Sequence, residues 1–358
     1  MLAVVVEPKP YMQQITISDL ESIQDVYDLV RDNFLDKRNE FKKSSEQFEI
    51  AINDIDLGVI NLSSLTMLIC LLYSVRKHYK FPFIGTIYSQ RDENYFADKR
   101  KSSYLKSVGF FDLTRSLRII QWYLPKKIDD QDFNPTTGID QLDIYQISPE
   151  VKKYYKIDGL DPYDKELILL NILKERHPHY DETELQLEYD EVKTRIKNDI
   201  KKFLASPTED LFSKISQGRT FKNNVVSYVS EILLNSFIHG REKPFLAIQR
   251  TNKLISVSVA DDGAGLEKSY FMLHKAKIKN SKEAIIKACA HRRNSSYGLF
   301  DVLSDSHHGF FTISDGSNIL KITRNNYHRL ASGEIIESIH DTKLNIRGVR
   351  ISLDILIK

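Results

Sequence analysis

A carboxylate, a carboxamide and an imidazole recur at every fourth position in the segment SEILLNSFIHG, residues 230–240. Residues four apart lie on the same side of an α-helix, so Glu231, Asn235 and His239 form one stripe on a helix predicted over 221–240. These groups can exchange protons and bind ligands. A polar stripe is also the usual solvated face of an amphipathic helix, and the helix pattern alone leaves both interpretations open.

A further acidic group follows a predicted strand in the segment KLISVSVADDGAGL, residues 253–266. The strand runs into Asp261, and Gly263 and Gly265 follow at alternate positions. Alternating glycines allow tight turns and a close approach of the backbone to a ligand. An aspartate at the strand end can accept a hydrogen bond from an exocyclic amine. The same pattern is common in ordinary tight turns, so a turn and a ligand site are both open.

The order and spacing of these segments resemble the GHKL ATPase superfamily, which includes gyrase, a heat-shock chaperone, histidine kinases and MutL. The helix motif precedes the Asp-x-Gly-x-Gly motif by about 26 residues, and a glycine-containing turn that opens a helix comes later. SEILLNSFIHG is similar to the corresponding box of bacterial anti-sigma factor kinases. The resemblance covers about 208–358 and implies a Bergerat-type ATP-binding fold, a two-layer α/β sandwich with helices on a mixed sheet.

The resemblance implies a role for each residue of the two motifs. Asn235 would bind Mg²⁺, which bridges the nucleotide phosphates, and Glu231 would act as general base in a hydrolysing member. Asp261 would receive the adenine amino group, above a floor shaped by the two glycines. For His239, a local structural role and contact with the nucleotide are both open.

The second glycine box departs from the family pattern because it keeps a single glycine, Gly298. Gly298 would open a helix whose backbone amides meet phosphate, while Asn294, Ser295 and Ser296 would supply side-chain contacts. The final strand begins with Gly348 and Val349 where the family has Gly-Thr, so a water-mediated adenine contact is lost or replaced.

The segment 267–293 between the boxes would be the ATP lid. It carries eight lysines and arginines against two glutamates. A solvated helix face, a phosphate clamp formed by Arg292 or Arg293, and a nucleic-acid patch are three interpretations of this charge. Aromatic residues are too sparse for base stacking, which disfavours single-stranded nucleic acid as a partner.

Composition favours a cytoplasmic two-domain protein. The chain has 358 residues, of which 41% are hydrophobic and 28% charged, with a net charge of +2. Its two cysteines give neither a disulfide framework nor a metal-ligand spacing, which suits a reducing compartment. The most apolar helix candidate, 62–75, is too short to span a bilayer, so no membrane partner is expected.

Alternating strands and helices predict a smaller α/β domain with parallel pairing over 1–123. The phrase YLKSVGFF loosely resembles STAS-like domains found beside some bacterial ATPases, which implies a regulatory role. Residues 124–207 are predicted as an irregular connection followed by a helical linker. The expected N-terminal elements are strands over 56–61 and 81–88, a helix from 62 capped by Ser63 or Ser64, and a short helix over 102–112 that ends at Gly109.

From these observations we expect Mg²⁺-dependent ATP binding by residues 208–358, with slow hydrolysis that switches a protein partner. Two alternatives stay open: a serine/threonine kinase of the anti-sigma type, and a degenerate module that binds partners without nucleotide. ATP and Mg²⁺ are the expected ligands, and a homodimer is compatible with the helical linker.

Overall fold

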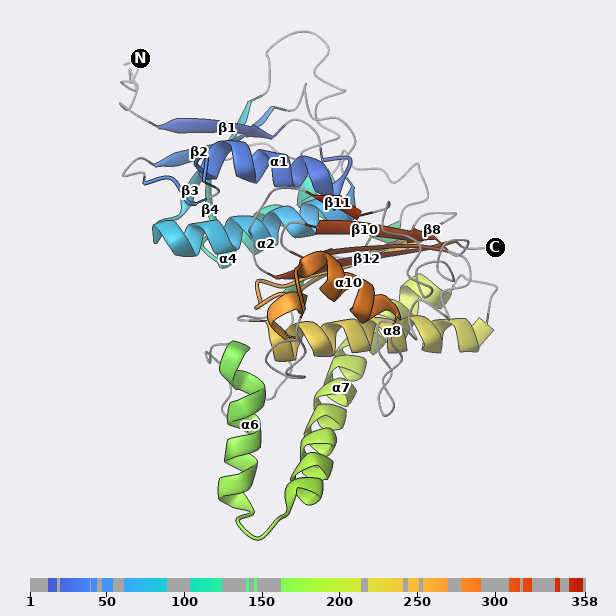
Figure 1. Cartoon of the computed structure of the whole chain (residues 1–358). Helices are drawn as coiled ribbons and strands as arrows, with labels where there is room; N and C mark the ends of the chain where they lie inside the picture. The colour runs from blue at the N-terminus through green and yellow to red at the C-terminus, as the bar shows by residue number, and fades with distance from the viewer. Residues whose placement is uncertain are drawn as a thin grey trace, which may run out of the picture.

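The computed structural model describes residues 12–17, 20–38, 40–43, 47–53, 61–88, 104–123, 140–141, 145–146, 162–213, 218–240, 244–250, 254–269, 278–290, 309–315, 318–323, 339–341 and 348–356. They form a mixed α/β structure with one parallel and one antiparallel sheet. Helices lie between the two sheets and also on the far side of the antiparallel sheet (Figure 1).

The N-terminal domain is built on a four-stranded parallel sheet in the described part of the chain. Its strand order follows the sequence order. Right-handed connections between sequential parallel strands place their helices on the same face, and the predicted parallel pairing is confirmed. The elements are β1 (Gln13–Ile17), α1 (Ile23–Phe34), β2 (Phe48–Asn53), α2 (Leu62–Tyr79), β3 (Phe83–Tyr88), α4 (Phe110–Ser116) and β4 (Ile120–Tyr123).

Local chemistry shifts two of the predicted boundaries. Asn61 caps α2 by accepting a hydrogen bond from the amide of Ser63 at 2.8 Å, so neither Ser63 nor Ser64 is the cap. The strand predicted over 56–61 is therefore wrong at Asn61, and its other residues lie outside the described ranges. A helical turn over 104–107 ends at Gly109 as predicted, and Gly109, at φ 73°, is also the N-cap of α4.

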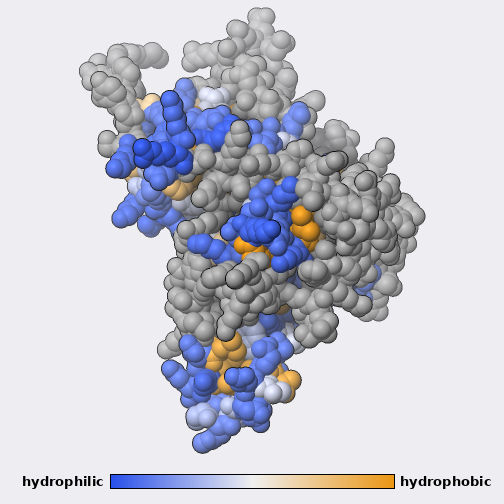
Figure 2. Space-filling view, viewed as in Figure 1, coloured by the Kyte–Doolittle hydropathy of each residue, from blue (hydrophilic) through white to orange (hydrophobic). Residues whose placement is uncertain are grey.

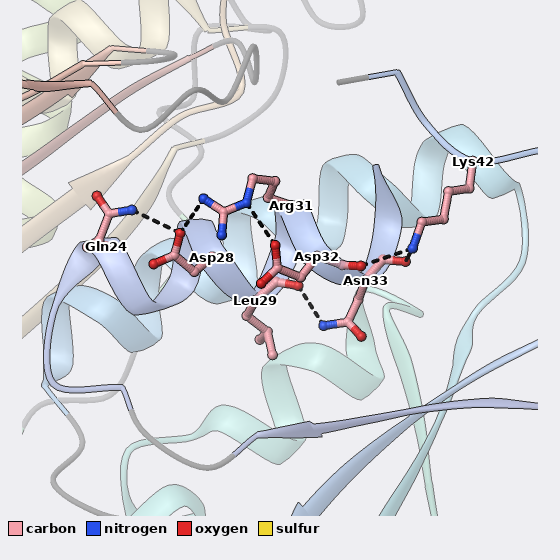
Figure 3. A network of polar contacts seen from close by, with 7 residues as sticks. All are labelled: Gln24, Asp28, Leu29, Arg31, Asp32, Asn33 and Lys42. Carbon is pink, nitrogen blue, oxygen red and sulfur yellow. Dashed lines mark hydrogen bonds and ion pairs between the residues drawn. The ribbon is translucent and has the colours of Figure 1, made fainter. Parts of the chain in front are cut away.

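α1 is held by its own polar residues on the side away from the core (Figure 3). Arg31 contacts Asp28 at 2.6 Å and Asp32 at 2.8 Å. After the helix, the Lys42 ammonium donates to the carbonyl oxygens of Asp32 and Asn33, both at 2.9 Å. A cation at these last carbonyls complements the helix dipole and fixes the C-terminal end of α1.

The antiparallel sheet has the order β11-β10-β9-β12-β8-β7-β5, and β6 also pairs with β7. All pairs among the described strands are antiparallel, so the prediction of a mixed sheet is wrong. The strands are β5 (Asp140–Gln141), β6 (Tyr145–Gln146), β7 (Phe245–Arg250), β8 (Leu254–Ala260), β9 (Gly309–Asp315), β10 (Asn318–Thr323), β11 (Ile339–Asp341) and β12 (Val349–Leu356).

Two short strands come from the segment predicted as an irregular connection. β5 and β6 both pair with β7, at one edge of the sheet. The C-terminal sheet therefore takes chain from before the helical linker as well as after it. Their two-residue length explains why the sequence gives no strand signal, because periodicity needs four or more residues.

Side chains alternate between the two faces of the antiparallel sheet. On the α8 face, Val257, Val259 and Ile313 belong to the hydrophobic core shared with α8 (Gly218–His239). On the α2 face, Ala247 and Ala260 belong to the core of the N-terminal domain. Because α2 also packs on β7 and β8, it is buried between the two sheets.

α6 (Pro162–Arg176) and α7 (Glu182–Ser213) form a hairpin that extends away from the sheets (Figure 1). α7 packs against α8 at its other end and continues past the domain boundary predicted at 207/208. Apolar side chains lie among hydrophilic ones on this hairpin (Figure 2), and Leu187 is 63% exposed. No helix in the described ranges is both long and apolar enough to cross a membrane.

Candidate functional site

The polar stripe lies on one unbroken helix, α8, which ends at His239. Its members differ in exposure: Glu231 is 6% exposed, Asn235 and His239 are half-buried, and Asn224 further upstream is exposed. This side of α8 is therefore exposed at Asn224, buried at Glu231 and half-buried at Asn235 and His239, unlike the uniformly exposed face of an ordinary surface helix.

Glu231 is enclosed by α7. Its Oε2 lies 2.6 Å from the Nζ of Lys197, and both side chains are mostly buried. Sequence reasoning missed this partner because Lys197 is 34 residues away on another helix. The ion pair attaches the proposed catalytic carboxylate to the α6–α7 hairpin.

Asp261 follows β8 and is 3% exposed. Its Oδ1 accepts hydrogen bonds from the amides of Gly263 at 2.9 Å and Val349 at 3.1 Å, and its own amide donates to the Val349 carbonyl at 3.0 Å. Burial raises the pKa of Asp261 to about 6, although these two hydrogen bonds lower it. The carboxylate is thus fixed between its loop and the first residue of β12.

The Asp261–Gly265 loop contacts the end of the helix that carries the stripe. The amide of Ala264 donates to the carbonyl oxygen of His239 at 3.3 Å. A Cβ on Gly263 would collide with that same oxygen and with the Cα of Gly240. Glycine is required at 263 for this approach. The two motifs identified in the sequence therefore meet in space.

Asp315 at the end of β9 supports the loop from the other side. Its Oδ2 accepts the amides of Leu266 at 3.0 Å and Glu267 at 3.4 Å. Gly265 has φ 83°, and a Cβ there would collide with the Asp315 carboxylate. Burial raises the pKa of Asp315 to about 7, despite those two amides. The segment TISDG resembles VADDG in ending a strand with an acid before glycine, a signal that could have identified Asp315.

Arg350 lies on β12, between the two strands that lead to these acids. It pairs with Ala260 on β8 and with Ser314 on β9, the residues directly before Asp261 and Asp315. It alternates in direction with Val349, so it points to the α2 face, where it is 2% exposed. The alternating segment GVRISL places Arg350 on the polar side of its strand, a pattern that by itself predicts a solvent-exposed side chain.

Part of the predicted lid belongs to the core. α10 (Ser281–Ala290) packs on β9 and β10 through Ala284, Ile285 and Cys289, all buried. Asn318 of β10 donates to the hydroxyl of Ser281, where α10 begins. The remaining predicted residues Arg292, Arg293, Asn294, Ser295, Ser296 and Gly298 lie outside the described ranges.

Within the described ranges, no group of three or more His, Cys, Asp or Glu side chains is arranged to hold a metal ion. Searches for relatives found no matching family model and no significant match among curated proteins or solved structures. The arguments for function therefore come from the residues that α8, the Asp261–Gly265 loop and the ends of β9 and β12 bring together.

Proposed function

We propose that the chain is a Mg²⁺-dependent ATP-binding protein of the GHKL type, with a Bergerat-type fold, that works as a nucleotide-dependent switch. One observation carries the proposal: the Asp261–Gly265 loop packs directly against His239 and Gly240 at the end of the stripe. Each motif taken alone could be an ordinary helix face or turn, and their contact supports a common site. The described helices and the antiparallel sheet are compatible with a sandwich of this type.

Adenine would be recognised by Asp261. Its Oδ1 is held by the amides of Gly263 and Val349, so the carboxylate cannot rotate when a ligand arrives. The other oxygen would accept the exocyclic amine. A buried carboxylate oriented by backbone donors selects for an amine. A base with a carbonyl at that place would leave its own oxygen and the free carboxylate oxygen of Asp261 without a donor.

The phosphates would lie nearer the middle of α8. A hard cation prefers oxygen ligands, and Mg²⁺ commonly takes one or two protein oxygens together with phosphates and water. Asn235, half-buried one turn after Glu231, would supply such an oxygen. The need for phosphate oxygens accords with a site where the protein alone provides few ligands.

The Lys197–Glu231 ion pair favours binding with slow turnover over rapid hydrolysis. A general base has to lie within about 3 Å of the water that it deprotonates. One oxygen of Glu231 is already occupied by the Lys197 ammonium at 2.6 Å. The contact between the α6–α7 hairpin and α8 would control whether Glu231 is available, which suits a switch that a protein partner or a second copy of the chain recognises. The two buried cysteines have free thiols, which suits a reducing cytoplasm.

The binding test is a calorimetric titration with a non-hydrolysable ATP analogue, with and without Mg²⁺. Asn235→Ala should lose the Mg²⁺-dependent part of the affinity while its apo melting temperature stays near that of the parent. Asn224→Ala, an exposed change on the same helix, is the matched control. Equal Mg²⁺-dependent binding by the parent and Asn235→Ala would contradict the assignment.

Base selection and hydrolysis need separate variants. Asp261→Asn presents a donor to the exocyclic amine and should reduce the preference for ATP over GTP.

Glu231→Gln, which keeps a hydrogen-bond acceptor for Lys197, should retain ATP binding, and its rate of phosphate release should fall by about 10²–10⁴ if Glu231 is the base. Equal release by parent and Glu231→Gln would remove Glu231 from catalysis.

A further inference from the structure

Arg350 presents a problem of charge burial. The residue is 2% exposed, and its guanidinium donates to the carbonyl oxygen of Gly348 at 3.1 Å and to the hydroxyl of Tyr27 at 3.3 Å. Arginine stays charged in proteins, and a buried charge is costly unless nearby groups compensate for it. The surroundings of Arg350 must therefore supply negative charge as well as hydrogen-bond acceptors.

Asp261 and Asp315 are two buried acids at the ends of the strands that flank Arg350. They follow Ala260 and Ser314, the two register partners of Arg350. Burial raises the pKa of both carboxyl groups, and the positive charge of Arg350 opposes that rise in each. The guanidinium thus acts on Asp261 through its charge, and it also holds Gly348, next to the Val349 amide that binds Asp261.

Tyr27 connects the same arginine to α1 of the N-terminal domain. The Tyr27 ring is fully buried, and its hydroxyl is hydrogen-bonded to both Arg350 and Ser314. A second connection comes from α2, where Lys77 lies 3.8 Å from the Asp262 carboxylate. Helix α1 therefore contacts β12 through Tyr27, and helix α2 contacts the Asp261–Gly265 loop through Lys77.

We propose that Arg350 is a positioning residue through which the N-terminal domain holds the nucleotide site: its guanidinium ties Tyr27 of α1 to Gly348, next to the Val349 amide that holds Asp261. This assignment rests on the proposed function, which gives Asp261 its contact with adenine. Linkage then requires reciprocity, so nucleotide must strengthen the docking of α1 by the same factor that docking strengthens nucleotide binding.

The effect of Arg350 is distinguishable from plain packing because it is electrostatic. An opposite charge at close range lowers the pKa of a carboxyl group by about 1–3 units. Removing the charge should raise the titration midpoint of Asp261 by that amount, and a midpoint near 8 would leave most of Asp261 protonated at pH 7. In the described part of the chain, the other titratable or charged groups around Asp261 include Asp262, Asp315, Lys77, Cys70, Tyr27 and His239.

The first measurement needs no nucleotide. Carboxyl carbon-13 shifts would follow the titration of Asp261 in the full-length parent, Arg350→Gln and Arg350→Lys. We expect the midpoint to rise by about 1–3 units in Arg350→Gln and to stay near the parent value in Arg350→Lys, which keeps the charge. Arg115→Gln on α4, whose side chain is 53% exposed, controls for loss of a cation. An unchanged midpoint in a folded Arg350→Gln would overturn the proposal.

The second measurement adds the ATP analogue. At pH 7 the affinity of Arg350→Gln should fall about tenfold if the midpoint rises by two units, and it should recover at pH 9. In the parent, nucleotide should slow hydrogen exchange of α1 amides, and Tyr27→Phe should weaken that protection. If the parent binds no ATP, the proposed function fails; if it binds ATP while Arg350→Gln shows the parent's pH profile, the role of Arg350 fails instead.

Discussion

The two faces of the antiparallel sheet are built from different chemistry, although they share the same strands. The α8 face is aliphatic and includes Val259, Ile313 and Leu353. The α2 face has mostly small or polar residues in the alternate positions, including the buried Ser258 and Ser352, with Phe245 and Ile319 as larger apolar members. The α8 face packs against α8 of the same domain, and the α2 face packs against the N-terminal domain.

The difference shows how a sheet can support two kinds of attachment. Aliphatic residues bury volume, which stabilises α8 without specifying direction. Small residues let α2 approach closely, and orientation then comes from paired hydroxyls such as Ser63 with Ser352 at 2.6 Å. The α8 face should therefore dominate stability, and the α2 face should determine how the domains are placed.

The largest effect is expected from a cavity on the α8 face. Ile313 is fully buried and pairs with Ile351 and Leu320 on the neighbouring strands. Ile313→Ala should lower the free energy of unfolding by about 2–5 kcal/mol, and Ile313→Val by about 0.5–1.5 kcal/mol. Urea titrations measure both. A loss below 1 kcal/mol for alanine would mean that this face is not the main stabilising one.

A pH-dependent effect is expected at the charged edge of the α8 face. The pKa of Asp315 is raised to about 7 by burial, so the folded state holds a proton that the unfolded state releases above pH 4. The protonated carboxyl therefore contributes to stability below pH 4, and this contribution is lost as the pH rises to about 7. The free energy of unfolding should fall by at most about 1.4 kcal/mol per pH unit over this range.

Asp315→Asn tests that dependence, because its amide oxygen can still accept the Leu266 amide without ionising. Between pH 5 and pH 8, the free energy of unfolding measured by urea titration should rise in the variant relative to the parent. Any fall that remains should end near pH 6, where Asp261 has titrated. A constant difference across this range would show that Asp315 ionises normally.

An intermediate effect is expected from extra volume on the α2 face. Ser258 lies between Ala247 and Ser352 in the register and is buried. Ser258→Leu should cost about 1–3 kcal/mol through overpacking against α2. Ser258→Ala, which adds no volume, is the control. If leucine at 258 is tolerated as well as alanine, the two faces are less different than their compositions indicate.

The smallest effect is expected from the Ser63–Ser352 pair. Either single alanine variant leaves a buried hydroxyl without its partner and should cost about 1 kcal/mol. The double variant removes both groups and should cost less than the sum of the two single changes. A double-mutant cycle on melting temperatures measures the coupling, and strict additivity would show that the two hydroxyls do not stabilise each other.

Local patterns predicted the elements that carry the site, but not the contacts that complete it. The strand over 81–88 and the helix over 221–240 have periodic or continuous apolar sequence, and both are confirmed within two or three residues. The Asp261–Gly265 loop follows its strand as predicted. Such signals depend on neighbouring residues in the chain, which a single sequence displays.

The missed groups depend on distant contacts. Lys197 reaches Glu231 across two helices, Asp315 supports a loop 48–49 residues earlier, and Arg350 contacts Tyr27 over 323 residues. Periodicity shows that a strand has two faces but not which partner covers each one. A single sequence therefore could not indicate that the face of β12 carrying Arg350 is buried.

The burial of α2 between two sheets has a consequence for biosynthesis. Ser63 at the start of α2 meets a partner 289 residues later in the chain. At about 5–20 residues per second, β12 is synthesised about 15–60 s after α2. During that interval the helix can pack on its own parallel sheet while its other apolar side stays uncovered. Nascent chains and fragments that end before β7 should therefore attract chaperones and aggregate.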